Sequence, residues 1–393
     1  MIYNNFDELK LSSLGLGAMR LPTVDGIIDE AKARELIEYA YGNGINYFDT
    51  AYGYHSGASE AFLTSVLHQY PRESWYIASK MPGHMMQYKN GKIEGLGYMA
   101  GETIESLAQI FEKQLERCKV DYFDFYLLHN ICETAYDFYT DQELRVSEYL
   151  LEQKKLGRIR HLGISAHGRA ETIDKFLSTT PGIEFVQLQL NYMDWTLQDA
   201  KKKYEVVTKH GLPIVVMEPV RGGMLASLSA DADAMLKSSR PNDSTVSWAF
   251  RYLQSLPNVP VVLSGMTTMD QLKENIELFS KHDPTTEQDH MLFNKVVDTL
   301  LDSVPCTACE YCLEACPQKL HISKLISIFN EMRFGGSFAT ELFTLNAMNQ
   351  EELPSACIEC GECNKLCPQE IDVPAVLKDF CDILTAKTAG GSK

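Results

Sequence analysis

The sequence predicts an α/β protein built as a (β/α)8 TIM barrel, followed by a small, mainly α-helical domain. Short apolar segments alternate with segments of helical periodicity eight times in about 280 residues. Short, continuously apolar strands are typical of a parallel sheet buried on both faces, and eight of them favour a closed barrel over an open sheet. No Gly-x-Gly-x-x-Gly follows the first strand, which removes the main signal for a Rossmann fold. Near the C-terminus, two cysteine runs of identical spacing mark the second domain.

The barrel elements follow one another as strand, then helix. The predicted strands are 11–16, 45–48, 75–79, 123–128, 159–164, 185–188, 214–217 and 261–263. The predicted helices are 30–42, 58–69, 103–117, 141–156, 169–177, 197–210, 244–256 and 269–278. In the first helix, Ala33, Leu36, Ile37 and Ala40 recur at helical spacing. Gly42-Asn43-Gly44 then stops it.

The chain divides into four predicted segments. The barrel takes residues 1–285, and a bridging helix takes 286–302. The cysteine domain takes 303–385, and the last residues, 386–393, are expected to be a disordered tail.

Composition limits the classes of partner and compartment. A net charge of −17 argues against nucleic acid and against an anionic membrane surface as partners. No run approaches eighteen consecutive apolar residues, so a spanning helix is not expected. Residues 1–10 are polar and acidic rather than a signal peptide, which predicts the reducing cytoplasm.

The two cysteine runs have the spacing of iron–sulfur ligands. Each reads Cys-x-x-Cys-x-x-Cys-x-x-x-Cys-Pro, as in bacterial two-cluster ferredoxins, where the fourth cysteine ligates the other cluster. The prediction is therefore two [4Fe–4S] clusters with crossed ligands. The first cluster would use Cys306, Cys309, Cys312 and Cys367. The second would use Cys357, Cys360, Cys363 and Cys316.

Structural zinc is the main alternative, since CxxC pairs also bind zinc. A zinc site needs only four ligands, whereas two groups of four at one spacing, each closed by Cys-Pro, suit cubane clusters better. The connection from Cys316 to Cys357 is long, and segments 322–329 and 373–384 look helical. The domain thus resembles the α-helical ferredoxin type of respiratory iron–sulfur subunits.

Polar side chains that could act together stand where predicted strands end, the usual place for chemistry in this fold. Asp49, Lys80 and His129 follow the second, third and fourth strands, and Tyr54 lies five residues beyond Asp49. In order and context these four residues resemble the catalytic tetrad of the aldo-keto reductase family. The resemblance covers roughly residues 11–278, and with the cysteines it extends to the members that carry an appended [4Fe–4S] domain.

The resemblance implies reduction of a carbonyl, or oxidation of an alcohol, by hydride transfer. Tyr54 would be the general acid, with its phenolate stabilised by the Lys80 cation. Asp49 would pair with Lys80 and hold it in place. His129 would polarise and orient the substrate carbonyl, as a neutral imidazole or a cation.

The resemblance also implies a nicotinamide cofactor. The residues it assigns to cofactor binding are Gly17, Ala18, Met19, Ser165, Gln187, Glu218, Pro219, Val220, Gly223, Leu225, Ser264, Gly265, Met266, Gln271 and Asn275. Related enzymes that grip the NADP 2′-phosphate often have Lys and Arg where this chain has Gly265 and Gln271. NADP(H) and NAD(H) therefore both stay open, and a flavin, for which no motif is visible, is kept as a further alternative.

Two features of the sequence have more than one interpretation. Residues 81–101 form a long glycine- and methionine-rich loop, either a lid over the substrate or a flexible insertion. The clusters could be structural or sensory, or they could exchange electrons with a redox protein partner. A third hypothesis is an electron-transfer or interaction subunit with an idle barrel, against which the intact tetrad argues.

Overall fold

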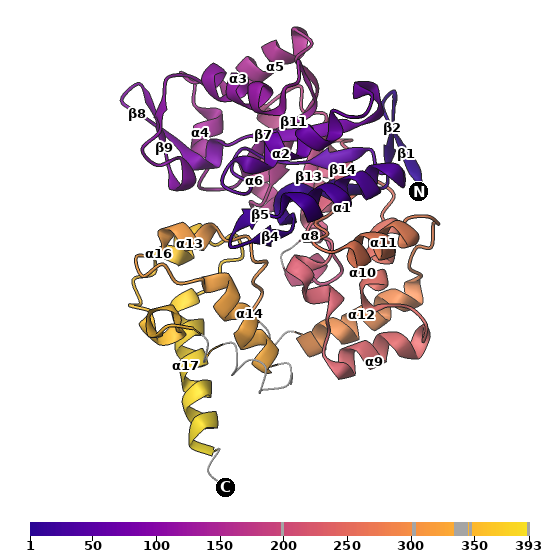
Figure 1. Cartoon of the computed structure of the whole chain (residues 1–393), viewed down its shortest axis with the longest axis vertical. Helices are drawn as coiled ribbons and strands as arrows, with labels where there is room; N and C mark the ends of the chain where they lie inside the picture. The colour runs from indigo at the N-terminus through magenta and orange to yellow at the C-terminus, as the bar shows by residue number, and fades with distance from the viewer. Residues whose placement is uncertain (198–199, 301–303, 334–344, 346–347, 391–393) are drawn as a thin grey trace. The chain divides into compact units, whose positions relative to one another are not determined.

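The computed structural model describes residues 1–197, 200–300, 304–333, 345 and 348–390, and two compact units are distinguished within them (Figure 1). One unit comprises Met1–Pro219 with Ala249–Thr285. The other comprises Val220–Trp248 with the described residues from Thr286 onward. Each unit is described by itself.

A closed barrel of eight parallel strands forms the first unit, as the sequence predicts. Its strand order is β3-β6-β7-β11-β12-β13-β14-β15, with β15 pairing back to β3. The strands are β3 (Leu14–Gly17), β6 (Tyr47–Asp49), β7 (Tyr76–Met81), β11 (Phe123–Ile131), β12 (Ile159–Ala166), β13 (Phe185–Gln189), β14 (Ile214–Met217) and β15 (Val261–Ser264). Every residue of β11 and β13 is buried, including the polar residues Asp124, His129 and Gln187, as expected for parallel strands covered on both faces.

Helices follow the strands along the chain. They are α1 (Glu30–Gly42), α2 (Ala58–Leu67), α3 (Leu107–Cys118), α4 (Tyr136–Thr140), α5 (Val146–Lys155), α6 (Ala170–Thr179), α7 (Asp194–Leu197), α8 (Ala200–Lys209), α10 (Thr245–Gln254) and α11 (Met269–Leu278). The helix predicted from residue 103 begins only at Leu107, because Ser106 caps it by accepting a bond from the Gln109 amide.

The predicted first strand is wrong at its start, because a hairpin that precedes the barrel in sequence takes its first two residues. Residues 11–16 do not form one strand, because Leu11 and Ser12 belong to β2 (Leu9–Ser12), which pairs with β1 (Tyr3–Phe6). Phe6 of this hairpin packs edge-on against Phe125 and Phe185 from the barrel strands. Together with Leu9 and Leu11 it belongs to the same buried cluster as these residues, so the hairpin is part of the barrel core.

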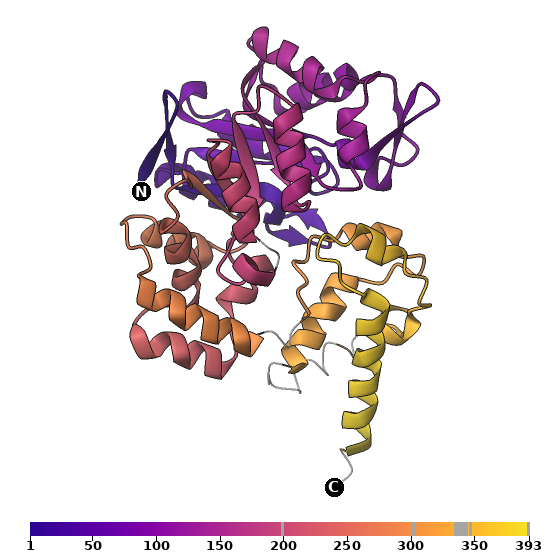
Figure 2. The same cartoon turned by 180° about the vertical axis from the view of Figure 1, so that it is seen from behind.

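The long loop after β7 has its own secondary structure. It contains η3 (Gly83–Met85), β8 (Met86–Lys89), β9 (Lys92–Gly95), η4 (Gly97–Met99) and β10 (Thr103–Ile104). The three strands form an antiparallel sheet, in which Met86, Ile93 and Ile104 are buried. The insertion, seen at the edge of Figures 1 and 2, is therefore an ordered element rather than a structureless loop. A second small hairpin, β4 (Thr23–Val24) with β5 (Ile27–Ile28), precedes α1.

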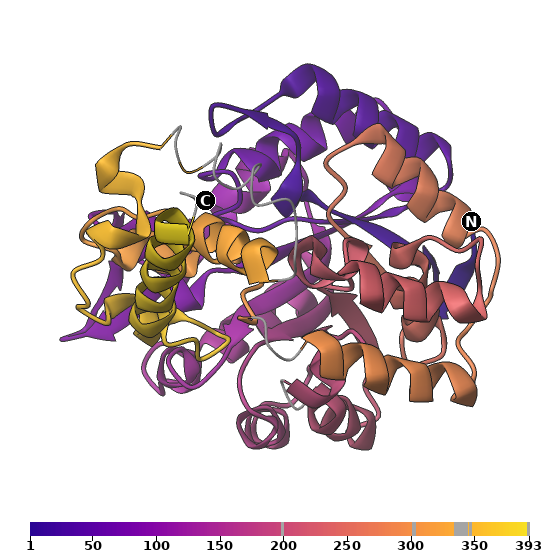
Figure 3. The same cartoon turned by 90° about the horizontal axis from the view of Figure 1, so that it is seen from below.

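The second unit is helical in its described residues. After η5 (Arg221–Ala226), helix α9 (Ala230–Ser239) packs beside α12 (Glu287–Leu300), as Figure 3 shows. The cysteine-rich part contains α13 (Tyr311–Ala315), α14 (Ile322–Arg333), η6 (Gln350–Glu352), η7 (Pro354–Ala356), α16 (Glu362–Leu366) and α17 (Val373–Gly390). Helix α14 packs on α17 through Phe329 and Phe380 (Figure 2).

Two segments of the predicted domain plan can be compared with the helices of the structure. Helix α12 occupies most of the segment predicted as a bridging helix. Helix α17 continues to Gly390, so it includes the first residues of the segment expected to be a disordered tail; residues 391–393 lie outside the described part. No helix in the described residues is long and apolar enough to cross a membrane.

Candidate active site and cluster sites

Neighbouring barrel strands bring three of the predicted catalytic residues together. Asp49 ends β6, Lys80 lies in β7 and His129 in β11, and these strands pair in that order. The Lys80 ammonium lies 2.6 Å from the Asp49 carboxylate and also donates to the Thr50 carbonyl at 2.7 Å. Lys80 is fully buried and Asp49 nearly so. The predicted ion pair is present and shielded from solvent.

Tyr54 and His129 lie beside this pair. The Lys80 nitrogen is 5.0 Å from the centroid of the Tyr54 ring. The Tyr54 and His129 rings are 6.1 Å apart and nearly perpendicular. The structure thus gathers the four residues Asp49, Tyr54, Lys80 and His129 in one place, although they span eighty residues of sequence.

Burial dominates the electrostatics of the pair and of the tyrosine. Burial raises the pKa of Asp49 and lowers the pKa of Lys80, while the opposite charge of each partner offsets part of that effect. Burial, followed by the charges of Asp49 and Glu218, raises the pKa of Tyr54 well above its usual value. In this state Tyr54 is a protonated phenol.

Three histidines lie on loops and strand ends near the tetrad, and all are neutral at pH 7. Burial, then the charges of His84, Lys80 and His167, holds the pKa of His129 well below its usual value. Burial lowers the pKa of His84 to about 4 and that of His167 to about 3. The His84 ring lies 4.4 Å from the His129 ring. His84 and His167 belong to no sequence motif, yet both lie within the electrostatic reach of His129.

A second layer of hydrogen bonds holds the catalytic segment. Gln187, predicted as a cofactor ligand, donates to the second oxygen of Asp49 at 3.0 Å. The Thr50 hydroxyl donates to Ser59 at 2.9 Å, and Ser59 donates to the Ala18 carbonyl at 3.0 Å. These bonds connect the segment after β6 with Ala18, another predicted cofactor residue.

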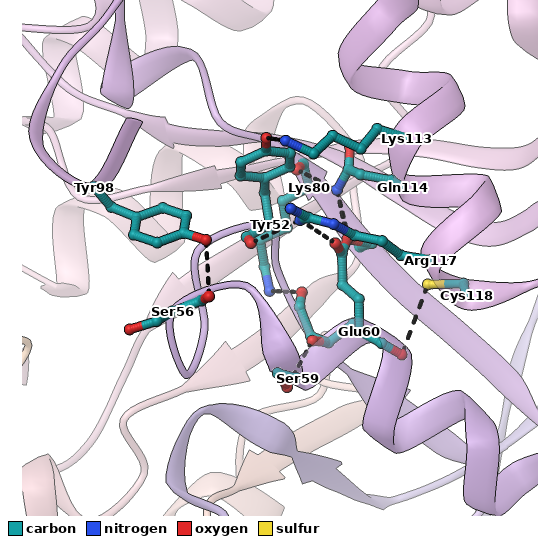
Figure 4. A network of polar contacts seen from close by, with 12 residues as sticks. Tyr52, Ser56, Ser59, Glu60, Lys80, Tyr98, Lys113, Gln114, Arg117 and Cys118 are labelled. Atoms are coloured by element: carbon teal, nitrogen blue, oxygen red, sulfur yellow. Dashed lines mark hydrogen bonds and ion pairs between the residues drawn. The ribbon is translucent and has the colours of Figure 1, made fainter. Parts of the chain in front are cut away.

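Glu60, on α2, is the centre of a buried polar network that the sequence did not reveal. Its carboxylate accepts hydrogen bonds of 2.6 Å from both Ser79 and Gln114, and it lies 3.3 Å from the Arg117 guanidinium. In Figure 4 the side chains of Gln114 and Arg117, both on α3, converge on Glu60. Gln114 also donates to the Lys80 carbonyl at 3.1 Å. The network therefore supports the strand residue that carries the catalytic cation.

The sequence contains one signal that Glu60 is buried, but the signal does not identify its partner. Glu60 shares the buried face of α2 with Leu63, Thr64 and Leu67, at spacings of three, four and seven residues. An acidic residue on an apolar stripe requires a buried partner. Which partner it finds depends on α3, and the sequence does not give that pairing.

The predicted cofactor residues of the barrel unit gather at strand ends and in the segments that follow them. Gly17 ends β3 and lies next to the Ser264 carbonyl at the end of β15. Asn275 on α11 donates to the Ser264 hydroxyl at 3.1 Å. The remaining members of this group are Ala18 and Met19 in η1 (Ala18–Arg20), Ser165 in β12, Gln187 in β13, Glu218 and Pro219 after β14, and Gly265, Met266 and Gln271 around the start of α11.

Three predicted cofactor residues belong to the other compact unit. Val220, Gly223 and Leu225 lie in or beside η5, where the Gly223 and Leu225 amides donate to the Val220 carbonyl. Gly223 has a φ of 103°, which only glycine adopts without strain.

The start of α11 is closed by its own side chains. Thr268 accepts a bond from the Gln271 amide, and the Gln271 side-chain oxygen accepts from the Thr267 amide at 2.9 Å and the Thr268 amide at 3.2 Å. A Cβ at Gly265 would come within 2.9 Å of the Arg20 side chain, so Arg20 fills the space beside Gly265. Two amides that could have bound a phosphate at this helix start are occupied by Gln271.

The first predicted ligand set is assembled as the crossed arrangement requires. The charges that act on Cys312 are those of Cys309, Cys306 and Cys367, so the fourth cysteine of the second run joins the first three of the first run. Burial and these neighbouring thiols raise the pKa of Cys309 to about 12. The four neighbouring thiols, of which Cys312 is buried and the other three are partly buried, fit a metal cluster, because binding a metal deprotonates and pairs them.

The second ligand set mirrors the first. The charges that act on Cys363 are those of Cys357, Cys360 and Cys316. These four cysteines line one cavity, together with apolar residues that include Ile322, Val373 and Leu377. The cavity is the kind of apolar pocket that a cubane cluster would fill.

Comparisons with known proteins agree with both parts of the chain. The profile described as "Aldo/keto reductase family" matches residues 13–298, and the profile described as "4Fe-4S dicluster domain" matches residues 305–371. "Probable aldo-keto reductase 1" of Glycine max is 28% identical over 54% of this chain and 57% of that protein. "NADH-specific methylglyoxal reductase" of Escherichia coli is 24% identical over 68% of this chain and 90% of that protein.

A solved structure gives the same result for the fold. The holo form of an aldo-keto reductase from Bacillus halodurans superimposes with a TM-score of 0.59 at 27% identity, covering 75% of this chain and 96% of that one.

Proposed function

This chain belongs to the aldo/keto reductase family and carries a 4Fe-4S dicluster domain, and from that premise we propose that it is an NAD(P)H-dependent oxidoreductase. It interconverts a small-molecule carbonyl and an alcohol by hydride transfer. We propose the domain plan as a barrel at 1–285, a bridging helix at 286–302 and a cluster domain from 303, whose last helix continues to Gly390. Its compartment is the cytoplasm, where its thiols stay reduced.

The observation that carries the proposal is the buried Asp49–Lys80 pair beside Tyr54 and His129. In the reduction, carbon gains a hydride and the carbonyl oxygen gains the Tyr54 proton, which yields the alcohol and a phenolate. The raised pKa of Tyr54 would hinder that transfer, so Lys80, 5.0 Å from the ring, is the cation that stabilises the phenolate as it forms. Neutral His129 can donate a hydrogen bond that orients the carbonyl.

A bound nicotinamide supplies or accepts the hydride. The residues that would hold it are the fifteen predicted cofactor residues, apart from Gln187. The Gln187 amide donates to Asp49, so Gln187 would act through that carboxylate. We propose NAD(H) as the preferred form, because Gln271 occupies the amides at the start of α11 that would otherwise face a 2′-phosphate. The name of the Escherichia coli relative, an NADH-specific reductase, supports this choice.

The eight cysteines would hold two [4Fe–4S] clusters in the crossed ligand sets, and each cluster would accept or give one electron. A hydride that reduces a carbonyl carries both of its electrons into the alcohol. The clusters would therefore take electrons only when NADH or the alcohol is oxidised without a carbonyl acceptor, and the hydride would then give two electrons, one for each cluster, and one proton. We propose that the clusters exchange these electrons with a redox protein. The second candidate is an electron-transfer subunit with an idle barrel, which the eight assembled cysteines would serve equally well.

One experiment separates these functions. The protein is purified without oxygen and mixed with NADH, then NADPH, with and without a panel of carbonyls, while the broad absorbance of the clusters is followed. Bleaching by NADH supports electron exchange, and turnover of a carbonyl without bleaching makes the clusters bystanders. Absence of turnover with every carbonyl and alcohol would support the idle barrel. A Tyr54→Phe variant that reduces carbonyls at the full rate would contradict the role of Tyr54.

A further inference from the structure

The two cysteine runs differ in the burial of the residue that follows their first cysteine. The first run reads Cys306-Thr307-Ala308-Cys309 and the second reads Cys357-Ile358-Glu359-Cys360. Thr307 is only 3% exposed, whereas Ile358, at the same place in the second run, is 57% exposed. Burying a threonine while exposing an isoleucine reverses the usual preference of these side chains. The second run therefore presents an apolar residue where the first does not.

Ile358 is accompanied by other signs of an accessible cluster. Cys360, two residues on, is the one exposed cysteine among the eight predicted ligands. Leu366, in the same run, is 46% exposed. An exposed ligand brings its cluster close to the surface, which shortens the path for an electron to a partner.

Acidic residues outnumber basic ones in the segment that contains this surface. Residues 349–385 contain eight Asp and Glu against two Lys, whereas residues 304–333 contain three acidic and three basic residues. Glu359 and Glu362 are exposed on either side of Cys360, and Glu362 pairs with Lys365 at 2.7 Å. The second run therefore has an exposed apolar centre within a segment of net negative charge, with Glu359 as the exposed acid beside Cys360.

We propose that the surface formed by Ile358, Glu359, Cys360, Glu362 and Leu366 is the docking site for a protein one-electron carrier with a basic rim. This inference rests on the proposed function, since it needs occupied clusters. The carrier would exchange one electron at a time with the cluster ligated by Cys360. An apolar centre provides the contact, and opposite charges steer the encounter. A second copy of the chain would bring two acidic segments together, and an anionic membrane would be repelled, so neither fits.

The test uses the holoprotein, reduced with dithionite without oxygen, and mitochondrial cytochrome c as a basic one-electron acceptor. We expect fast reduction of cytochrome c that slows as salt rises, and slow reduction of cytochrome b5, which is acidic. Glu359→Lys should slow the cytochrome c reaction roughly tenfold at low salt. Ile358→Thr, which copies the residue of the first run, should slow it at all salt concentrations.

The controls test whether the change in the rate of cytochrome c reduction comes from this surface. Glu35→Lys makes the same charge change on an exposed position of α1 and should leave the rate within about twofold. Benzoquinone, a small neutral oxidant, should oxidise all variants equally. Equal rates with cytochrome c for Glu359→Lys and the parent would overturn the docking site. So would self-association through this surface, or binding to anionic vesicles that Glu359→Lys does not strengthen.

The outcomes for the two proposals stay distinct. If NADH fails to reduce the clusters but the dithionite-reduced protein passes electrons to cytochrome c through this surface, the link to the barrel fails and the docking site stands. A purified chain without iron would overturn both.

Discussion

Lys80 is held by two oxygen acceptors, and two buried carboxylates act on its charge. Asp49 binds its ammonium directly, while Glu60 acts on it through its charge and also accepts a hydrogen bond from Ser79, the residue before Lys80. Asp49 stands at a strand end, where the sequence already suggested chemistry. Glu60 stands on a helix face, where its role appears only when α2, α3 and β7 are packed together.

Removing the direct partner of Lys80 should be costly. Asp49→Asn leaves a buried ammonium without its counter-charge, which typically costs about 3–5 kcal/mol of unfolding free energy. Urea denaturation of the barrel would measure it. An exposed pair provides the control: Glu112→Gln, which loses the contact with Arg158, should cost less than about 1 kcal/mol. Equal losses for the two variants would contradict the assignment of Asp49–Lys80 as a buried, interdependent pair.

Removing the charge of Glu60 should also destabilise the barrel. Glu60→Gln keeps much of the side-chain shape but leaves Arg117 without its carboxylate and Ser79 with a weaker acceptor, so we expect a loss of about 1–3 kcal/mol. The same denaturation experiment measures the loss. A pH profile of carbonyl reduction adds a second readout, because the Glu60 charge raises the pKa of Lys80; its removal should move any Lys80-dependent limb to lower pH. A fully stable variant with an unshifted profile would refute the role.

Buried histidines predict a loss of stability in acid. The folded-state pKa of His84 is about 4, below the unfolded value of about 6.5, so the neutral folded form is favoured fully above pH 6.5. That contribution is lost as pH falls from 6.5 towards 4, at up to about 1.4 kcal/mol per pH unit for one histidine. His84→Gln should reduce the slope of unfolding free energy against pH in this window. An identical slope in parent and variant would show that His84 is not buried as a neutral ring.

Among the elements, the insertion after β7 is the clearest addition to a plain barrel. Its Tyr98 donates to the Ser56 carbonyl at 2.8 Å, as Figure 4 shows, and its Met85 lies against Gly53. Ser56 and Gly53 flank Tyr54. The insertion therefore braces the segment that carries the candidate proton donor, whereas the sequence alone left it open as a lid or a flexible insertion.

Weakening this brace should loosen the catalytic segment. Tyr98→Phe removes one hydrogen bond, worth about 1 kcal/mol, and should speed hydrogen exchange of the amides in residues 52–57 by roughly fivefold. Tyr88→Phe is the matched control, because the Tyr88 hydroxyl donates instead to the exposed Glu143. Faster exchange at 52–57 in the Tyr88 variant, or none in the Tyr98 variant, would argue against the brace.

The whole molecule combines a barrel that needs no metal for its core with a small domain whose core contains the cysteines. Cys312 and Cys363 are buried among Leu320, Ile326 and other apolar residues of α14 and α17. Because the predicted cluster ligands are part of this core, cluster binding and folding of the domain should be linked.

Loss of one ligand tests that link and the crossed sets together. Cys312→Ala should lower the iron content from about eight to about four per chain, or further if the domain unfolds. Cys381→Ala, outside both sets, should leave it unchanged. Far-ultraviolet circular dichroism would show a partial loss of helical signal, no larger than the share that the smaller domain contributes. Unchanged iron in Cys312→Ala would refute the ligand assignment.

The sequence by itself predicted the barrel and the eight cysteines, because periodicity and fixed spacing are local properties of a chain, and a family resemblance named the four candidate catalytic residues at and after strand ends. It did not determine the split of residues 11–16 between hairpin and barrel, since pairing with β1 decides that boundary. Only the tertiary structure placed Glu60 against Gln114 and Arg117, set His84 against His129, and closed the start of α11 with Gln271. Burial and charge pairing between distant segments decide these features, and the sequence does not state which segments meet.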